Sequence, residues 1–384
     1  MSVVLERPPL WRRVLPVFYG FDLPLLLGLV LLGGIGLVTM YSAGYDHGTR
    51  FVDHGRNMLL ALFILFAVAQ VPPQKLMRVA VPLYTVGVAL LIATALFGVT
   101  KKGATRWLNV GIVIQPSELL KLAMPLMLAW WFQKREGQLR TLDFVVAGLL
   151  LLVPVGLVVK QPDLGTAILI LSGGLYVIYF AGLSWKLILP VLLAGAIAVA
   201  ALVMSGDRIC QDDVKWPAMR DYQKHRVCTL LDPTTDPLGK GFHIIQGMIA
   251  IGSGGPTGKG FMKGTQTHLE FIPERTTDFV FAAYAEEFGL MGTLGLIACF
   301  TFVLARGLVI AAQAPTAFTR LLGGALTMSF FTYAMVNMGM VSGILPVVGI
   351  PLPFISYGGT AMVTLGLAMG MLMSIARSRR LMQS

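Results

Sequence analysis

The chain is poor in charged residues. Asp, Glu, Lys and Arg make up 13% of its 384 residues and hydrophobic residues make up 56%, whereas a soluble domain carries about 25% charged residues. The hydrophobic residues recur in runs of about 17–25, the length that lets a helix cross a lipid bilayer. This composition excludes a soluble globular domain and predicts an all-α polytopic membrane protein. No soluble domain or large linker interrupts the runs, so we expect residues 1–384 to form one transmembrane domain.

The sequence also lacks the signatures of several enzyme classes. It contains no Walker A motif, no GxGxxG motif after a strand, no HExxH and no CxxC, and its five histidines do not cluster as metal ligands would. Neither ATP hydrolysis nor nicotinamide redox chemistry is indicated, and no nucleotide cofactor is expected. The segment before Phe21 is short and basic, and no small-residue cleavage pattern follows the first apolar run, so no cleavable signal peptide is predicted.

The net charge of +11 does not indicate a nucleic-acid partner. The basic residues lie mostly in short loops between the apolar runs, where they specify membrane topology. Ten transmembrane helices are expected, and they lie at about 21–43, 57–71, 80–99, 116–132, 143–159, 164–182, 187–205, 279–305, 321–345 and 359–376.

An even number of spans places both termini on one side of the membrane. Lys and Arg are concentrated in the two tails and in the short loops on that same side, so both termini of this multi-pass protein are predicted to be cytoplasmic. Residues 206–278, between spans seven and eight, then form one large extracytoplasmic loop.

Only three cysteines occur. Cys299 falls inside an apolar run, where packing explains it. Cys210 and Cys228 share the large loop, which the topology places on the oxidising side of the membrane. A disulfide and two free thiols both fit the sequence, and the location favours the disulfide.

Residues 239–292 are unusually polar for this chain. Residues 241–251 have apolar residues at helical spacing, which predicts a helix that lies on the membrane surface or lines a cavity; we favour the surface helix. Residues 252–264 are rich in glycine and carry Lys259 and Lys263. Their amides and ammonium groups can cradle phosphate oxygens, or the segment is only a flexible loop. Further along, residues 286–287 are two glutamates, either functional or paired structural charges.

Three sites place charged residues in or beside predicted spans, where such residues usually face a cavity or each other. In QPSELLK, Glu118 and Lys121 share one helix face, either at a substrate site or as a self-neutralising pair. In KQPDLGT, Asp163 either faces the cavity or caps the sixth span. Asp278 begins the eighth span. With a preceding threonine as the N-cap, it is either a functional carboxylate or only an acid matched to the helix dipole.

Two further stretches lie on the outer side by this topology. Residues 101–113, KKGATRWLNVGIV, bring Arg106 and Trp107 to a substrate surface, or form a solvated hairpin loop with an interfacial tryptophan. Residues 349–360, GIPLPFISYGGT, break the start of span ten and either line a cavity or form a surface turn. Carboxylates, lysines and arginines at the outer membrane surface suit an anionic, lipid-linked substrate.

Seven motifs resemble the SEDS family (shape, elongation, division and sporulation) and together span nearly the whole chain. They are KGATRWLNVG, QPSELLK, QPDLGTA, LLDP, GFHIIQGMIAIGSGG, GKGFMKGTQTHLEFIPERTTDFVFAAYAEEFG and PLPFISYGGT. The form GTQTHLEFIPERTTDF is closer to the elongation branch than to the division branch, which usually has a histidine-containing LPEAHTDF. Thr276 stands where many relatives have histidine, so this position receives no catalytic role. The segment that carries Cys210 and Cys228 is longer than the family usually has.

The resemblance implies a peptidoglycan glycosyltransferase of cell-wall elongation in the bacterial cytoplasmic (inner) membrane. Its substrate would be lipid II, a disaccharide-pentapeptide on undecaprenyl diphosphate, and its partner a class B penicillin-binding protein that supplies the transpeptidase. Asp278 matches the position regarded as the essential acid. Glu118, Lys121 and Asp163 match polar cavity positions, and Trp107 matches a loop position important for activity.

Such a reaction joins the 4-hydroxyl of one sugar to the anomeric carbon of another. Because diphosphate is already a good leaving group, one carboxylate base is sufficient, in contrast to the two carboxylates of ordinary glycosidases. Asp278 is the candidate base, or a ligand of a divalent cation, Mg²⁺ or Mn²⁺, that neutralises the diphosphate. The basic candidates to bind the diphosphate are Arg106, Lys121, Lys259, Lys263 and Arg275.

Other functions fit part of this pattern. A flippase that moves a lipid-linked precursor also uses intramembrane charges and broken helices, but it needs charges that reach both faces, whereas the motifs here cluster on the outer side. A scaffold that only activates a partner enzyme, and a division-type paralogue, are the remaining hypotheses.

Overall fold

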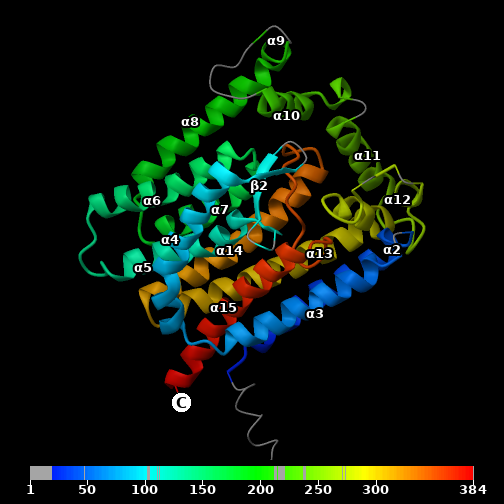
Figure 1. Ribbon diagram of the computed structural model, residues 1–384. Coiled ribbons are helices and arrows are strands. Elements are labelled where there is room, and N and C mark those ends of the chain that lie inside the picture. Colours follow the sequence, from blue (N-terminus) through cyan, green and yellow to red (C-terminus); the bar gives the residue numbers. More distant parts are fainter. Residues whose placement is uncertain are drawn as a thin grey trace, which may run out of the picture.

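The structure is a computed structural model that describes residues 20–46, 48–101, 104–109, 111, 113–211, 214, 221–236, 239–269, 271–272 and 274–383. Helices dominate the described chain (Figure 1). Those that correspond to the ten predicted spans are α2 (Leu23–Ala43), α3 (Arg50–Ala69), α4 (Pro73–Phe97), α5 (Pro116–Gln133), α6 (Thr141–Lys160), α7 (Leu164–Phe180), α8 (Trp185–Met204), α13 (Val280–Ala312), α14 (Ala317–Val341) and α15 (Gly359–Gln383).

Within the described residues, eight of these helices are long and apolar enough to cross a membrane. The other two are α5, which carries Glu118 and Lys121, and α7, which has 17 residues. Both pack inside the bundle, where α5 contacts α4, α7 and α14. The predicted class, an all-α polytopic membrane protein, is therefore confirmed.

The predicted limits of several spans are wrong. Helix α3 begins at Arg50, seven residues before the predicted start, because its first turns are polar and do not show as an apolar run. An ion pair, with Arg56 Nη2 3.2 Å from Asp53 Oδ1, lies in these turns. Helix α4 begins at Pro73, a residue that suits the first turn of a helix. Helix α13 continues past the apolar run because Arg306 is neutralised there by Asp22, whose Oδ1 accepts from its Nε at 2.8 Å.

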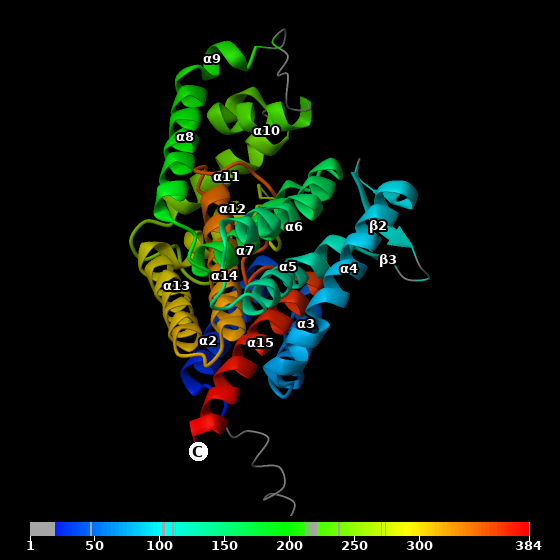
Figure 2. The same cartoon turned by 90° about the vertical axis from the view of Figure 1, so that its left-hand side faces the viewer.

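Helix α15 packs along α3, and the two run side by side in Figure 1. Glycines allow the close approach: a β-carbon at Gly366 would lie 2.6 Å from the carbonyl oxygen of Ala61, and one at Gly370 would lie 2.9 Å from that of Leu65. Small residues at such contacts are how membrane helices gain packing energy. In contrast, α8 exposes its apolar span and rises away from α13, α14 and α15 (Figure 2).

Helix α13 is broken at Gly289, where φ is +63°. The glycine-rich loop fills the break. The N–H groups of 259–260 donate in order to the carbonyls of 286–287, both at 3.0 Å, and those of 290–291 donate in order to the carbonyls of 255–256, at 2.9 and 3.0 Å. The loop thus replaces the hydrogen bonds that the helix loses at the break.

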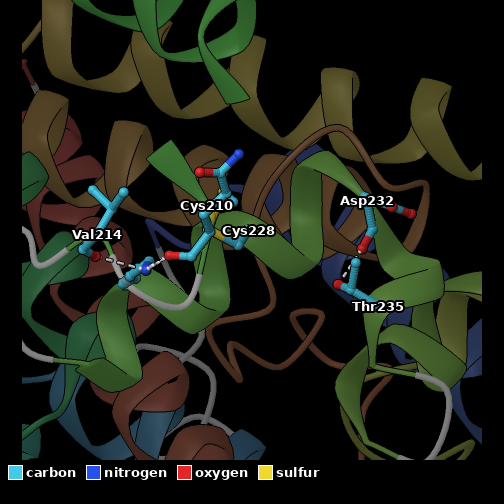
Figure 3. The surroundings of a disulfide bond; sticks show 7 residues. Cys210, Val214, Cys228, Asp232 and Thr235 are labelled. Carbon is cyan, nitrogen blue, oxygen red and sulfur yellow. Dashed lines mark hydrogen bonds between the residues drawn. A yellow bond between two sulfur atoms is a disulfide. The ribbon is translucent and has the colours of Figure 1, made fainter. Parts of the chain in front are cut away.

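The large loop forms a layer away from the C-terminus (Figures 1 and 2). Its elements are α9 (Gly206–Ile209), α10 (Asp221–Leu231), η1 (Pro233–Thr235), α11 (Lys240–Ser253) and α12 (Thr265–His268). The sulfurs of Cys210 and Cys228 are bonded, which ties the end of α9 to α10 (Figure 3). Helix α11 is the predicted helix over 241–251, and Ile244 and Ala250 are buried as it packs against α13.

A small antiparallel sheet, absent from the all-α prediction, follows α4. Its strands are β1 (Val99–Lys101), β2 (Ala104–Asn109) and β3 (Val113–Ile114), and β2 pairs with both neighbours. Trp107 pairs with Val99 across β1 and β2. Because β2 is hydrogen-bonded on both sides, the predicted hairpin loop is an ordered ribbon that carries Arg106 and Trp107.

Candidate functional site

Asp278 lies in the turn that leads into α13. The N-cap of α13 is Phe279, with no side-chain cap, so the prediction that Thr276 or Thr277 caps this helix is wrong. The hydroxyl of Thr276 accepts a hydrogen bond from Arg50, and that of Thr277 donates to Glu274 Oε2 at 2.6 Å. The Asp278 side chain is half-buried.

The turn that carries Asp278 is held by its carbonyl groups. The carbonyl oxygens of residues 276–278 accept, in order, from the N–H of Tyr357 at 2.8 Å, the hydroxyl of Ser356 at 2.6 Å and the side-chain amide of Asn337 at 2.9 Å. The three donors come from α14 and from the segment that leads into α15. Asp278 is therefore placed by parts of the chain that lie far away in sequence.

Residues 348–350 lie between Asp278 and the start of α7. A β-carbon at Gly349, which has φ +75°, would lie 3.3 Å from Asp278 Oδ2. On the other side, a β-carbon at Gly165 would lie 2.8 Å from the carbonyl oxygen of Val348. The broken segment that was predicted to line a cavity or to form a surface turn thus packs between two acidic helix starts, those with Asp278 and Asp163.

Asp163 caps α7 and also pairs with the sheet. Its Oδ1 accepts from the N–H of Thr166 at 3.2 Å, and its Oδ2 accepts from Gln115 Nε2 at 2.9 Å. Arg106 Nη1 lies 3.8 Å from the same carboxylate, and Arg106 Nη2 donates to Pro162 O at 2.6 Å. Asp163 therefore caps the helix, as one alternative predicted, and also joins a polar cluster, whereas its place in a substrate cavity stays a prediction.

Glu118 and Lys121 form a pair in α5, with Lys121 Nζ 2.6 Å from Glu118 Oε1. Glu118 Oε2 accepts from Thr364 at 3.2 Å, and Lys121 Nζ lies 5.5 Å from the ring centre of Tyr333. Tyr333 in turn packs in one cluster with Ile350. The pair is thus connected through Tyr333 to the segment beside Asp278.

Lys259 is used inside the protein. Its Nζ lies 2.7 Å from Glu286 Oε1 and donates to Thr265 at 2.7 Å. Glu286 is fully buried, and it also accepts from the backbone N–H groups of Gln266 and Thr267 at 2.8 and 3.2 Å. This network ties α12 to α13 beside the break in α13.

Several amides of the glycine-rich loop are already hydrogen-bonded within the protein and are not available to a phosphate, whereas binding of phosphate by the rest of the loop stays a prediction. The N–H of Gly258 donates to Gly254 at 2.9 Å, and the N–H groups of 259–260 bind α13. A β-carbon at Gly258 would lie 2.1 Å from Glu287 O, so the glycine is needed for this packing. Lys263, in contrast, has an exposed side chain.

Arg275 and Glu287 anchor the same region to the end of α2. Arg275 is buried, donates from Nε to Ala43 O at 3.0 Å and pairs with Asp46. Glu287 accepts from the hydroxyl of Ser42. These contacts favour a role for Arg275 in holding the loop, whereas its binding of a substrate stays a prediction.

A metal at Asp278 would have few protein ligands. Among the described residues, no group of three or more His, Cys, Asp and Glu side chains is placed to hold an ion. Mg²⁺ commonly binds through only one or two carboxylates together with substrate phosphates. Asp278 fits that arrangement only if substrate oxygens complete it.

Sequence reasoning missed Asn337 and Ser356. Asn337 is an amide inside a predicted span, and a buried polar side chain in a membrane helix is costly. Its Nδ2 donates two hydrogen bonds, while its Oδ1 has no partner among the described residues. That cost is a usable signal. Ser356 lies inside the motif PLPFISYGGT, and nothing in its spacing indicates that its hydroxyl reaches Thr277.

Comparison with known proteins places the chain in a family. Residues 16–381 match the family model of FtsW, RodA and SpoVE, described as cell cycle protein. The chain is 45% identical over 360 residues to the peptidoglycan glycosyltransferase MrdB of Escherichia coli K12, covering 93% of this chain and 94% of MrdB. The chain belongs to the SEDS family.

Two other SEDS proteins share less identity with this chain. RodA of Treponema pallidum is 29% identical over 92% of this chain and 97% of its own length. The probable FtsW of Trichlorobacter lovleyi is 32% identical over 94% of each chain. The higher identity to MrdB than to this FtsW agrees with the resemblance to the elongation branch.

The SEDS fold is also shared with solved structures. Crystalline RodA of Thermus thermophilus matches with a TM-score of 0.69 at 27% identity, over 94% of this chain and 98% of that one. A chain from a study of how a peptidoglycan synthase complex coordinates polymerization and crosslinking matches with a TM-score of 0.76 at 32% identity, over 94% of this chain and 99% of that one.

Proposed function

We propose that this SEDS protein is the peptidoglycan glycosyltransferase of cell elongation, which polymerises lipid II into β-1,4 glycan strands at the outer face of the cytoplasmic membrane. The 45% identity to MrdB over nearly the full length of both chains supports the activity and the elongation branch. The observation that carries the site is the half-buried carboxylate of Asp278, fixed through three consecutive carbonyls at the start of α13.

The chemistry assigned to Asp278 is that of a general base. The acceptor 4-hydroxyl attacks the anomeric carbon of the donor, the bond from that carbon to the diphosphate oxygen breaks, and the hydroxyl proton passes to Asp278. The lipid diphosphate leaves with its electron pair. One in-line displacement on an α-linked donor gives the β-linkage. A positioned base contributes about 10²–10⁴-fold to such a rate.

Two of the basic candidates, Arg106 and Lys263, are assigned to the diphosphate. Arg106 is partly exposed and stands on the sheet beside Asp163, and Lys263 is exposed on the loop next to α12. Arginine binds diphosphate oxygens through two parallel hydrogen bonds, and lysine acts as a point charge. A divalent cation, Mg²⁺ or Mn²⁺, held by Asp278 and the substrate would supply further charge neutralisation.

The polar cluster of α5 and α7 is assigned to the wall of the same site. Glu118, Lys121 and Asp163 are each engaged with neighbours, and Trp107 lies half-buried on β2 next to Arg106. In this proposal they orient the sugar and peptide parts of the substrate rather than react with it.

The partner is proposed to be a class B penicillin-binding protein, which crosslinks the strands. A structural relative is part of a study of a peptidoglycan synthase complex that joins polymerization to crosslinking. The termini are assigned to the cytoplasm. Gly20 and Arg377 support one shared side, because a β-carbon at Gly20 would lie 2.8 Å from Arg377 Cγ, so the first and last helices meet at one end.

The test is polymerisation of labelled lipid II by the purified protein, alone and with its partner, in a preparation free of other glycosyltransferases. Glycan strands made by this chain support the proposal. Transfer of intact lipid II across a vesicle membrane without any product would establish a flippase instead. Product that forms only with a partner able to polymerise by itself would establish a scaffold.

A further inference from the structure

The carbonyls of residues 276–278 lie just upstream of α13. The helix begins at Val280, and Ala282 N donates to Phe279 O at 3.0 Å, so the helical ladder starts after Asp278. These three carbonyls therefore need partners from elsewhere, since a buried carbonyl without one costs free energy. Each of them receives one donor, and each donor comes from residues 337–357.

Asn337 joins the turn to the broken segment. Its side chain is fully buried in α14, and its Nδ2 donates to Asp278 O at 2.9 Å and to Ile350 O at 2.7 Å. A single amide thus bonds the backbone of Asp278 and the backbone of the residue next to Gly349. Because Gly349 packs against the Asp278 carboxylate, the amide fixes both the acid and the surface that it faces.

Ser356 makes the second hydrogen bond to the turn, and the donor of that bond is determined. Its hydroxyl accepts from the N–H of Leu352 at 2.8 Å, and its only proton is donated to Thr277 O at 2.6 Å. The turn around it is itself held in place. Phe354 has φ +61°, and a β-carbon at Gly36 of α2 would lie 2.2 Å from Phe354 O. Ser356 therefore fixes Thr277, the residue before Asp278, to a rigid turn.

We propose that Asn337 and Ser356 are positioning residues for the glycosyl transfer, because they hold the turn at 276–278 so that the carboxylate of Asp278 meets the acceptor hydroxyl. This inference rests on the proposed function. A general base must lie within hydrogen-bond reach of the proton it takes, and a misplacement of about 1 Å can cost about 10²-fold in rate. Neither residue touches the substrate in this account.

The test compares two variants with two matched controls in the purified complex with the partner. Asn337→Leu removes both amide donors and keeps the number and branching of the side-chain heavy atoms, although leucine is larger, and Ser356→Ala removes the hydroxyl. Thr327→Val removes a buried hydroxyl of the same helix that bonds only Gly323 O, four residues back. Ser374→Ala removes a buried serine hydroxyl of α15 that donates to Val71 O, in the turn between α3 and α4.

Positioning predicts that kcat for lipid II falls by about 10- to 100-fold in both test variants, while KM changes less than about twofold and the controls keep the wild-type kcat. The melting temperature of each variant is measured beside it. If Ser356→Ala or a folded Asn337→Leu keeps the wild-type kcat, the proposal is overturned. It is also overturned if the controls lose as much kcat at an equal loss of melting temperature.

If the proposed glycosyltransferase function itself is wrong, the experiment gives a different result. In that case the wild-type complex makes no glycan strands at all, whatever the variants do. If Asn337→Leu does not fold, Ser356→Ala decides alone, because it deletes one hydroxyl and no carbon atoms.

Discussion

Lys259 Nζ lies 2.7 Å from Glu286 Oε1, and this pair spans the point where α13 is interrupted. Glu286 is fully buried, whereas the side chain of Lys259 is about one quarter exposed. The carboxylate holds the loop against the helix at the same two residues whose backbones are bonded, since the N–H of Lys259 also donates to Glu286 O at 3.0 Å. The pair is therefore part of the fold that presents Asp278, eight residues earlier in the chain.

Removing the buried carboxylate should destabilise the protein strongly. Glu286→Ala leaves Lys259 and the N–H groups of Gln266 and Thr267 without their acceptor, and breaking one side of a buried ion pair typically costs about 3–5 kcal/mol. Thermal unfolding of the purified protein checks this. Lys263→Ala serves as the control, since Lys263 is exposed and should leave the melting temperature unchanged. Equal melting temperatures for the two variants would contradict the account.

Two glycines of α13 should respond in opposite ways to alanine. At Gly289, φ is +63° and a β-carbon would lie 2.2 Å from Gly258 N, so Gly289→Ala should disrupt the contact with the loop and lower the yield of folded protein. At Gly295 no atom lies within 4 Å of the added carbon. Gly295→Ala should stabilise the helix by about 0.5–1 kcal/mol. Expression and melting temperature of both variants measure the difference. A well-folded Gly289→Ala protein would show that the close packing of the loop against the break in α13 is not required for folding.

The disulfide should stabilise the large loop and have little effect on the rate of polymerisation. Cys210 and Cys228 are 18 residues apart, and closing a loop of about that length stabilises by about 3 kcal/mol in the chain-entropy model. The double change Cys210→Ser with Cys228→Ser should speed proteolysis within the large loop and leave lipid II polymerisation near the wild-type rate. Cys299→Ser is the control. Unchanged proteolysis would show that the bond does not hold this layer.

The apolar spans could be predicted from the sequence because a long run of hydrophobic residues by itself indicates a helix in lipid. The polar first turns of α3 could not, since Asp53 and Arg56 neutralise each other only once they are helical. The small sheet was missed for a related reason: strand pairing between Val99 and Trp107 leaves little trace in a short polar segment.

The candidate site was only partly predictable. Asp278, Glu118, Lys121 and Asp163 stand out in sequence because charge beside a span is costly. Their mutual placement depends on Gly349 and Tyr333, which look like ordinary members of turn or apolar segments, and on Asn337, whose polarity inside a span is a signal that the sequence analysis did not use. The composition of the glycine-rich loop predicts a phosphate cradle but gives no sign that the amides of Lys259 and Gly260 bind α13.

The role of Asp278 as the catalytic base is tested by comparing two variants, Asp278→Asn and Glu274→Gln. Both changes neutralise one acid of the same turn at constant size, and Glu274 is exposed and bonded only to Thr277 among the contacts described above. The rate of glycan strand formation from lipid II is measured for the purified variants after each is shown to insert in the membrane. If Asp278 is the base, Asp278→Asn abolishes polymerisation, a loss of at least about 10²–10⁴-fold, while Glu274→Gln polymerises like the wild type. A purified Asp278→Asn protein with the wild-type rate would contradict this role.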